Sequence, residues 1–223
     1  MSAKHPSPAR LEAFSDGVIA VIITIMVLEL KVPQKNGIAA LFALLPAISI
    51  YALSFAFVGI FWINHHHLLH RTDRADERIL YSNLFFLFCL SLLPFFTAYV
   101  LEKKMDSFSV ALYVVSMILT GISFLTLRLA IGSYLRKTGQ LERDDAAAER
   151  KHWVSLAIYL IAVAFSFPFP KVALGVVAAV MLLWIVPNAR VVPVAHCVKD
   201  GDARGERSLA PELHSGMEES QPR

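Results

Sequence analysis

The sequence predicts an all-α integral membrane protein, and three observations lead to this fold class. The first is composition: 56% of the 223 residues are hydrophobic and only 17% are charged, whereas a soluble domain carries about 25% charged residues. The second is a series of long apolar runs, which raise the mean hydropathy to +0.56. The third is the distribution of basic residues, which gather in every second connection between the runs. Together they predict a chain that crosses the membrane six times.

Each predicted span is long enough to cross the hydrocarbon core, which is roughly 30 Å thick and takes about 20 helical residues. Backbone polar groups in lipid must be satisfied within the segment, so the runs are expected to be helices. Prolines, glycines or charged residues separate them, whereas Pro46 and Pro94 fall inside two of them, where a kink is tolerated. The six predicted transmembrane helices are residues 13–30, 38–63, 80–101, 108–131, 153–169 and 172–189.

The basic residues predict the orientation of the chain. Arginines and lysines are concentrated after the second and fourth helices and beside both termini, whereas the opposite side carries five lysines. The positive-inside rule therefore predicts that both termini are cytoplasmic. Polar, charge-rich ends with few aromatic residues are typical of disorder. The expected organisation is a disordered N-terminus (1–9), a six-helix transmembrane domain (10–190) and a polar, disordered cytoplasmic tail (191–223).

The first predicted helix carries polar groups within an apolar span. Ser15 and Asp16 open it and Glu29 closes it. Such groups are costly in lipid and normally face a protein interior or a water-filled path. This helix is therefore a candidate wall of a pore or substrate path rather than a plain anchor.

One face of this helix has the composition of a pore lining. Around a symmetry axis, aliphatic rings gate conduction by dewetting, and a hydroxyl ring replaces part of a cation's hydration shell. A single helix of this kind cannot enclose a pore, so several copies would have to close around an axis. The same spacing also fits an ordinary packing seam between transmembrane helices, and spacing alone does not decide between the two. The residues that share this face at 100° per residue are Gly17, Val21, Thr24 and Leu28, with Ile25 beside them.

The polar residues at the helix ends admit more than one role. A structural network is the main interpretation for Ser15 and Asp16, with ion coordination or proton relay as the alternative. The second helix ends in a histidine cluster, in which His66 and His70 have an i, i+4 spacing suited to a metal. No cysteine or nearby carboxylate in the sequence completes a site, so the prediction is a structural role, with proton sensing left open. No metal site and no cofactor are expected.

Several function classes are excluded by motifs that the sequence lacks. It has no Gly-rich phosphate loop, nucleophile elbow, paired catalytic carboxylates or zinc signature, so no enzyme and no catalytic residues are expected. A net charge of +3 is too small to indicate a nucleic-acid partner. There is no TVGYG-like loop either, which excludes a potassium channel with a re-entrant selectivity filter.

Two motifs and the six-helix layout resemble the transmembrane protein 175 family of potassium channels. One motif lies in the first helix and the other at the end of the second. They read Arg10-x3-Phe14-Ser15-Asp16-Gly17-x2-Ala20-Val21-x2-Thr24-x3-Leu28-Glu29-Leu30 and Trp62-x-Asn64-His65-His66.

This resemblance implies a symmetric homotetramer of six-helix subunits in the cell inner membrane, because bacterial members carry one such repeat per chain. The first helix would line the pore. Potassium ions would be the permeant ligand, with leak-like conduction and a modest preference over sodium. The implied partners are other copies of the chain, the lipid bilayer and potassium ions, with no cofactor.

The resemblance also implies roles for individual residues. The family's narrowest constriction falls on Val21, where most members have Ile or Leu. The smaller Val would leave a wider ring and shift the constriction toward Ile25 or Leu28. The family's threonine layer, which is implicated in ion binding and selectivity, falls on Thr24. The family's polar network, which holds the first helix in place, maps onto Arg10, Phe14, Ser15, Asp16, Trp62, Asn64 and His65.

Three other functions stay open at this point. A proton-permeable channel would use the same architecture. A proton-coupled secondary transporter would use Asp16 and the histidines, but transporters usually show repeats and broken helices that meet at mid-membrane. A non-conducting scaffold would assemble without supporting flux.

Overall fold

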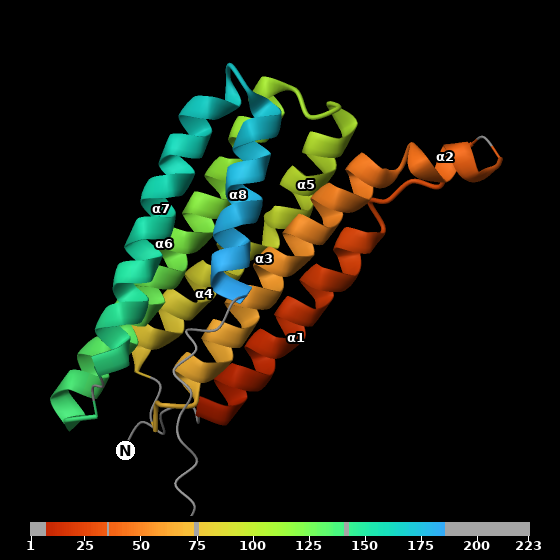
Figure 1. Cartoon of the computed structure of the whole chain (residues 1–223). Helices are drawn as coiled ribbons and strands as arrows, with labels where there is room; N and C mark the ends of the chain where they lie inside the picture. Colours follow the sequence, from red (N-terminus) through yellow and green to blue (C-terminus); the bar gives the residue numbers. More distant parts are fainter. Residues whose placement is uncertain (1–7, 35, 74–75, 141–142, 186–223) are drawn as a thin grey trace, which may run out of the picture. The chain divides into compact units, whose positions relative to one another are not determined.

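The computed structural model describes residues 8–34, 36–73, 76–140 and 143–185, and these residues form an all-helical unit (Figure 1). The predictions for most of the N-terminus and for the cytoplasmic tail lie outside the described residues. Pro8 begins the first helix, a position where its fixed φ and missing N–H are tolerated. The helices are α1 (Pro8–Val27), α2 (Ile38–Phe42), α3 (Leu45–Leu69), α4 (Glu77–Ser91), α5 (Leu93–Glu102), α6 (Ser107–Thr138), α7 (Arg143–Ser166) and α8 (Pro170–Ile185).

Two of the predicted continuous spans are divided in two, each at a proline. Residues 38–63 were expected as one helix but form the short α2 and the long α3, with Pro46 in the first turn of α3. Residues 80–101 form α4 and α5, with Pro94 in the first turn of α5. A proline has no N–H to donate and is best accommodated in a first turn, so a new helix starts beside each one.

Several helices extend beyond the apolar runs that predicted them. The helix predicted to end at residue 63 is α3, which ends at Leu69. The helix predicted to end at residue 131 is α6, which ends at Thr138. The apolar run measures the hydrocarbon thickness, whereas helix propensity and caps decide where the helix ends. Gly139, in the left-handed conformation with φ 73°, ends α6.

Three helices in the described part of the chain are long and apolar enough to cross a membrane. They are α3, the consecutive pair α4 and α5, and α6, and α8 is apolar but shorter. The first helix has 20 residues, yet it contains Arg10, Glu12 and Asp16. The all-helical fold and its membrane-spanning capacity are thus established, and the count of six spans stays a prediction.

The core is centred on α6, which packs against α4, α5, α7 and α8. Side chains are buried all along it, and Tyr113, Met117, Phe124 and Leu127 are among the fully buried ones. The first helix packs on the opposite side of α3 and α4 from most of this core, and Figure 1 shows α1 running alongside α3. It therefore lies at the edge of the subunit, with one face left uncovered.

Candidate functional site

The first helix buries one stripe of side chains and exposes the opposite one. The exposed side includes the face predicted from the spacing: Gly17, Val21, Thr24 and Ile25 are all exposed, Val21 by 55%. Leu28 is 77% exposed but lies just past the end of α1, in a turn closed by a hydrogen bond from its own N–H to the Ile25 carbonyl. The buried stripe consists of Leu11, Ser15, Ile19, Ile22 and Met26.

The Thr24 hydroxyl is oriented by its own helix. Its Oγ1 donates to the Val21 carbonyl oxygen at 2.9 Å. Because the hydroxyl proton is engaged within the helix, the lone pairs of the oxygen remain as acceptors on the exposed face. An oxygen presented in this way can coordinate a partly dehydrated cation.

A shallow apolar groove adjoins this exposed face, between α1 and α5. The first helix contributes Phe14, Val21 and Ile25, and the second wall includes Pro94 and Phe95. Phe14 is itself 54% exposed and makes this wall rather than joining a polar cluster. The groove continues the uncovered apolar surface of α1, so that surface has no cover within one subunit.

A buried chain of hydrogen bonds attaches the other side of α1 to α3 and α4. The Ser15 hydroxyl donates to the Leu11 carbonyl at 2.8 Å, and so it accepts from the Asn83 amide nitrogen at 2.9 Å. The Asn83 amide oxygen then faces His65 Nε2 at 2.7 Å, which requires the proton of the ring to be on Nε2. Ser15, Asn83 and His65 are fully buried. Removing any one of them would leave a buried polar partner unsatisfied.

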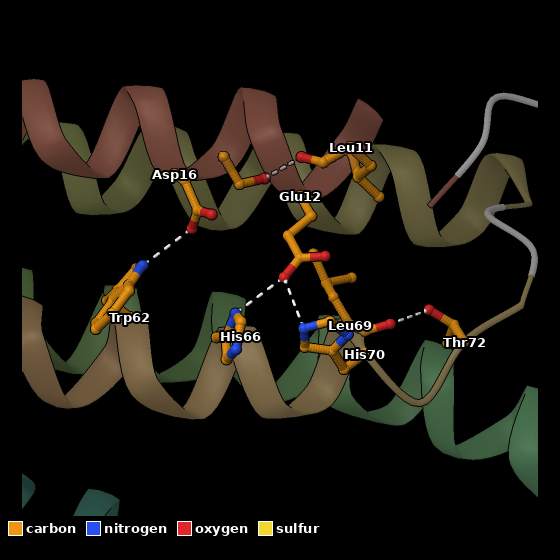
Figure 2. A network of polar contacts seen from close by, with 9 residues as sticks. Leu11, Glu12, Asp16, Trp62, His66, Leu69, His70 and Thr72 are labelled. Atoms are coloured by element: carbon orange, nitrogen blue, oxygen red, sulfur yellow. Dashed lines mark hydrogen bonds and ion pairs between the residues drawn. The ribbon is translucent and has the colours of Figure 1, made fainter. Parts of the chain in front are cut away.

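A second polar cluster joins α1 to the last turns of α3, and Figure 2 shows it from close by. Trp62 Nε1 donates to Asp16 Oδ1 at 2.9 Å. One turn earlier on α1, Glu12 Oε1 lies 2.9 Å from His66 Nδ1 and 3.4 Å from His70 Nε2. Glu12 and Asp16 are four residues apart, as are Trp62, His66 and His70 in turn, so matching faces of the two helices meet.

The structure brings together most of the predicted network residues and leaves some apart. Ser15, Asp16, Trp62 and His65 connect α1 to α3 and α4. Asn64 instead donates to the Ile60 carbonyl of its own helix at 2.7 Å. Arg10 is exposed, and no hydrogen bond or ion pair joins it to another of the described residues.

Two residues of the clusters were missed by reasoning from the sequence. Asn83 is the central residue of the buried chain, and its signal was a lone amide within the apolar run of α4. Glu12 carries the contact with the histidines, and its signal was the i, i+4 spacing to Asp16. Both pair with residues on other helices, and a single sequence does not show which helices are neighbours.

Comparisons with known proteins agree with this layout. A family model described as the endosomal/lysosomal potassium channel TMEM175 matches residues 10–94, which include both motifs. A potassium channel of Chryseobacterium sp. (strain P1-3) is 40% identical over 184 residues, which cover 82% of this chain and 94% of that protein. The chain belongs to the TMEM175 family. The resemblance inferred from the motifs is thereby confirmed, and the chain is a membrane channel protein rather than an enzyme.

Two further relatives of this TMEM175 family chain inform its fold and function. The crystal structure of a lysosomal potassium-selective channel TMEM175 homolog from Chamaesiphon minutus has a TM-score of 0.71 and 27% identity, and covers 80% of this chain and 96% of that chain. The endosomal/lysosomal proton channel TMEM175 of Rattus norvegicus is 34% identical over 100 residues, which cover 40% of this chain and 20% of that protein. The fold is therefore shared with a bacterial channel, and relatives are named for both potassium and protons.

Proposed function

We propose that this chain forms a homotetrameric, potassium-permeable channel in the bacterial inner membrane, with six spans per subunit and both termini in the cytoplasm. The observation that carries this proposal is the two-sided character of α1. Its buried stripe is attached to α3 and α4 by hydrogen bonds, whereas its apolar and hydroxyl face is uncovered. Four such faces around one axis would line a conduit.

Each exposed residue has a role in this proposal. Rings of Val21, Ile25 and Leu28 would be the hydrophobic constrictions, and a narrow aliphatic ring opposes conduction by excluding water. Thr24 would supply a ring of hydroxyl oxygens that replaces part of the hydration shell of potassium and favours it modestly over sodium. Conduction of this kind is leak-like and requires neither a re-entrant filter loop nor a resident cofactor.

The polar residues have a structural role in this proposal. Asp16 with Trp62, and Ser15 with Asn83 and His65, would hold α1 at a fixed rotation, so that the same face always points to the axis. The named bacterial relatives, which are potassium channels, support the choice of ion.

A proton-permeable channel is the second candidate. The observation that favours it is the match to mammalian relatives named proton channels. Purified protein in liposomes separates the two: a potassium gradient that drives potassium flux without acidification of an entrapped dye supports the first, and proton entry that outpaces potassium flux supports the second.

Thr24→Ala tests the selectivity ring. In liposomes with opposed potassium and sodium gradients, the variant should conduct both ions and lose most of the preference for potassium. Thr126→Ala is the matched control, because Thr126 is also exposed and also donates to a carbonyl of its own helix, but lies on α6 rather than on α1. The control should keep the wild-type preference. An unchanged preference in Thr24→Ala would remove Thr24 from the proposal, and an equal loss in both variants would count against a specific ring.

A further inference from the structure

We propose that Glu12, His66 and His70 form a binding site for a divalent transition-metal ion of the zinc type, which would link the start of α1 to the end of α3. This inference concerns a site outside the proposed pore lining and does not depend on ion conduction. It begins from three donor atoms, Glu12 Oε1, His66 Nδ1 and His70 Nε2, that all lie within 4.8 Å of one another.

The distances from the Glu12 carboxylate oxygen to the two histidine nitrogens suit a shared metal ion. Zinc binds histidine nitrogen and carboxylate oxygen at about 2.0–2.2 Å, so neighbouring ligands of a tetrahedral site lie about 3.3 Å apart. Glu12 Oε1 is 3.4 Å from His70 Nε2 and 2.9 Å from His66 Nδ1. A small outward shift of the Glu12 carboxylate brings the shorter distance into this range. Figure 2 shows the carboxylate between the two imidazole rings.

The kinds of ligand also fit. Two histidines four residues apart on a helix, with a carboxylate from a second helix, form a common set of three protein ligands for zinc. The His66 Nδ1 atom is buried and has no hydrogen-bond partner among the described residues, although Glu12 Oε1 lies close to it. A metal ion between the two atoms would satisfy this nitrogen, because neutral imidazole binds metals through its lone pair.

Access and the fourth ligand are available as well. The His70 side chain is 62% exposed, whereas Glu12 is 19% exposed. The ion would therefore enter from the His70 side and keep a water molecule there as the fourth ligand, the arrangement of an open site. The packed pair of α1 and α3 supplies the ligands from two sides.

The sequence alone favoured no metal at these histidines, because no cysteine or carboxylate at ligand spacing completes a site near them in the chain. Glu12 precedes His66 by more than fifty positions and reaches it only because α1 lies against α3. Folding thus supplies the ligand that the local sequence lacks.

Zinc titration of the tag-free, full-length protein in detergent, followed by calorimetry, tests the site. We expect one zinc ion per chain at neutral pH. Glu12→Gln and His70→Gln should each weaken binding at least about tenfold, since even substituting residues that only orient the metal ligands costs about 10–100-fold in affinity. His67→Ala is the matched control, because His67 is exposed on the same helix and lies outside the three-ligand cluster. It should keep the wild-type affinity.

A spectroscopic measurement keeps the test independent of folding losses. Cobalt(II) substituted for zinc should give the visible absorption of a tetrahedral site in wild type and in His67→Ala, and not in Glu12→Gln. Thermal unfolding of each variant without metal identifies any variant that fails to fold. If Glu12→Gln fails to fold, the zinc affinity of His70→Gln decides the test, since His70 is exposed. Equal zinc affinity in wild type, Glu12→Gln and His70→Gln would overturn the proposal, as would a comparable loss in His67→Ala. Neither result bears on potassium flux.

Discussion

The first and sixth helices use the same kinds of residue for different purposes. Both are apolar helices that contain a glycine and hydroxyl side chains bonded to carbonyls of their own helix. On α6 the hydroxyls of Ser116 and Thr120 are buried, and most of the apolar stretch of this helix lies inside the subunit. On α1 the Thr24 hydroxyl is exposed. Composition therefore does not distinguish a packing helix from a candidate pore helix, whereas the surroundings of the small and hydroxyl residues do.

Gly17 on α1 and Gly121 on α6 show this difference at single positions. A Cβ added at Gly121 on α6 would lie 2.8 Å from Leu156 Cδ2, and the Gly121 carbonyl is 2.8 Å from His152 Nε2. A Cβ added at Gly17 on α1 would meet nothing within 4 Å. Gly121 is thus part of a close helix contact within the subunit. Gly17 has no such contact within the subunit, and the same is true of Gly132 on α6.

The largest expected effect concerns whether the exposed face of α1 contacts water. In a background with Cys89 and Cys197 replaced by alanine, Thr24→Cys should react with a charged thiol reagent at least about 100-fold faster than Leu160→Cys, because the reactive species is the thiolate, which hydrocarbon disfavours. Leu160 is the matched control, since it is 61% exposed on α7 and should face lipid. The measurement is the rate of mass increase of the protein in lipid nanodiscs.

Similar, slow rates at both cysteines would contradict a water-filled environment for the exposed face of α1. That result would mean that the uncovered face of α1 contacts lipid, as the exposed face of α7 is expected to do. The pore-lining role of Val21, Thr24 and Ile25 would then be withdrawn, while the fold and the polar clusters would stand.

The contacts of α1 show which parts of the candidate site could be predicted from the sequence. That Gly17, Val21 and Thr24 share one face could be predicted, because their 4-3 spacing follows from helix geometry alone. Ser15 and Asp16 could be recognised because polar groups inside an apolar span need partners. The residues that complete the two clusters, Asn83 and Glu12, were harder to find, because their contacts with α3 depend on the register between helices, which packing across the whole bundle sets.

The next largest effect is expected at Asn83. Asn83→Ala removes the link between Ser15 and His65 and leaves two buried polar groups without their partner, each costing about 1–3 kcal/mol. We expect the free energy of unfolding in detergent, measured by heat or denaturant, to fall by at least about 1–3 kcal/mol. Asn64→Ala is the control of the same residue type, and it should cost less because Asn64 bonds only within its own helix and is partly exposed.

Equal stability losses at Asn83 and Asn64 would argue against the buried chain as the attachment of α1. The more informative readout combines stability with flux. If Asn83 fixes the rotation of α1 about its own axis, Asn83→Ala should also reduce the preference for potassium over sodium. The Thr24 side chains would then no longer be held at one distance from the symmetry axis.

The smallest effect is expected from Gly17→Ala and Gly121→Ala, which make the same substitution in both helices. Alanine is favoured over glycine in a helix by about 0.8–1.0 kcal/mol, and this gain applies at both positions. At Gly121 the new methyl group must displace the buried Leu156 side chain, and overpacking of this kind costs about 1–3 kcal/mol. Gly121→Ala should therefore be neutral to destabilising, whereas Gly17→Ala should stabilise the isolated subunit or leave it unchanged.

Thermal unfolding of the two variants side by side measures the difference between their stabilities, in which the shared gain in helix propensity cancels. A larger loss for Gly17→Ala would mean that Gly17 makes a close contact absent from the single subunit, and crosslinking of the assembled channel would then identify the neighbouring copy that makes it.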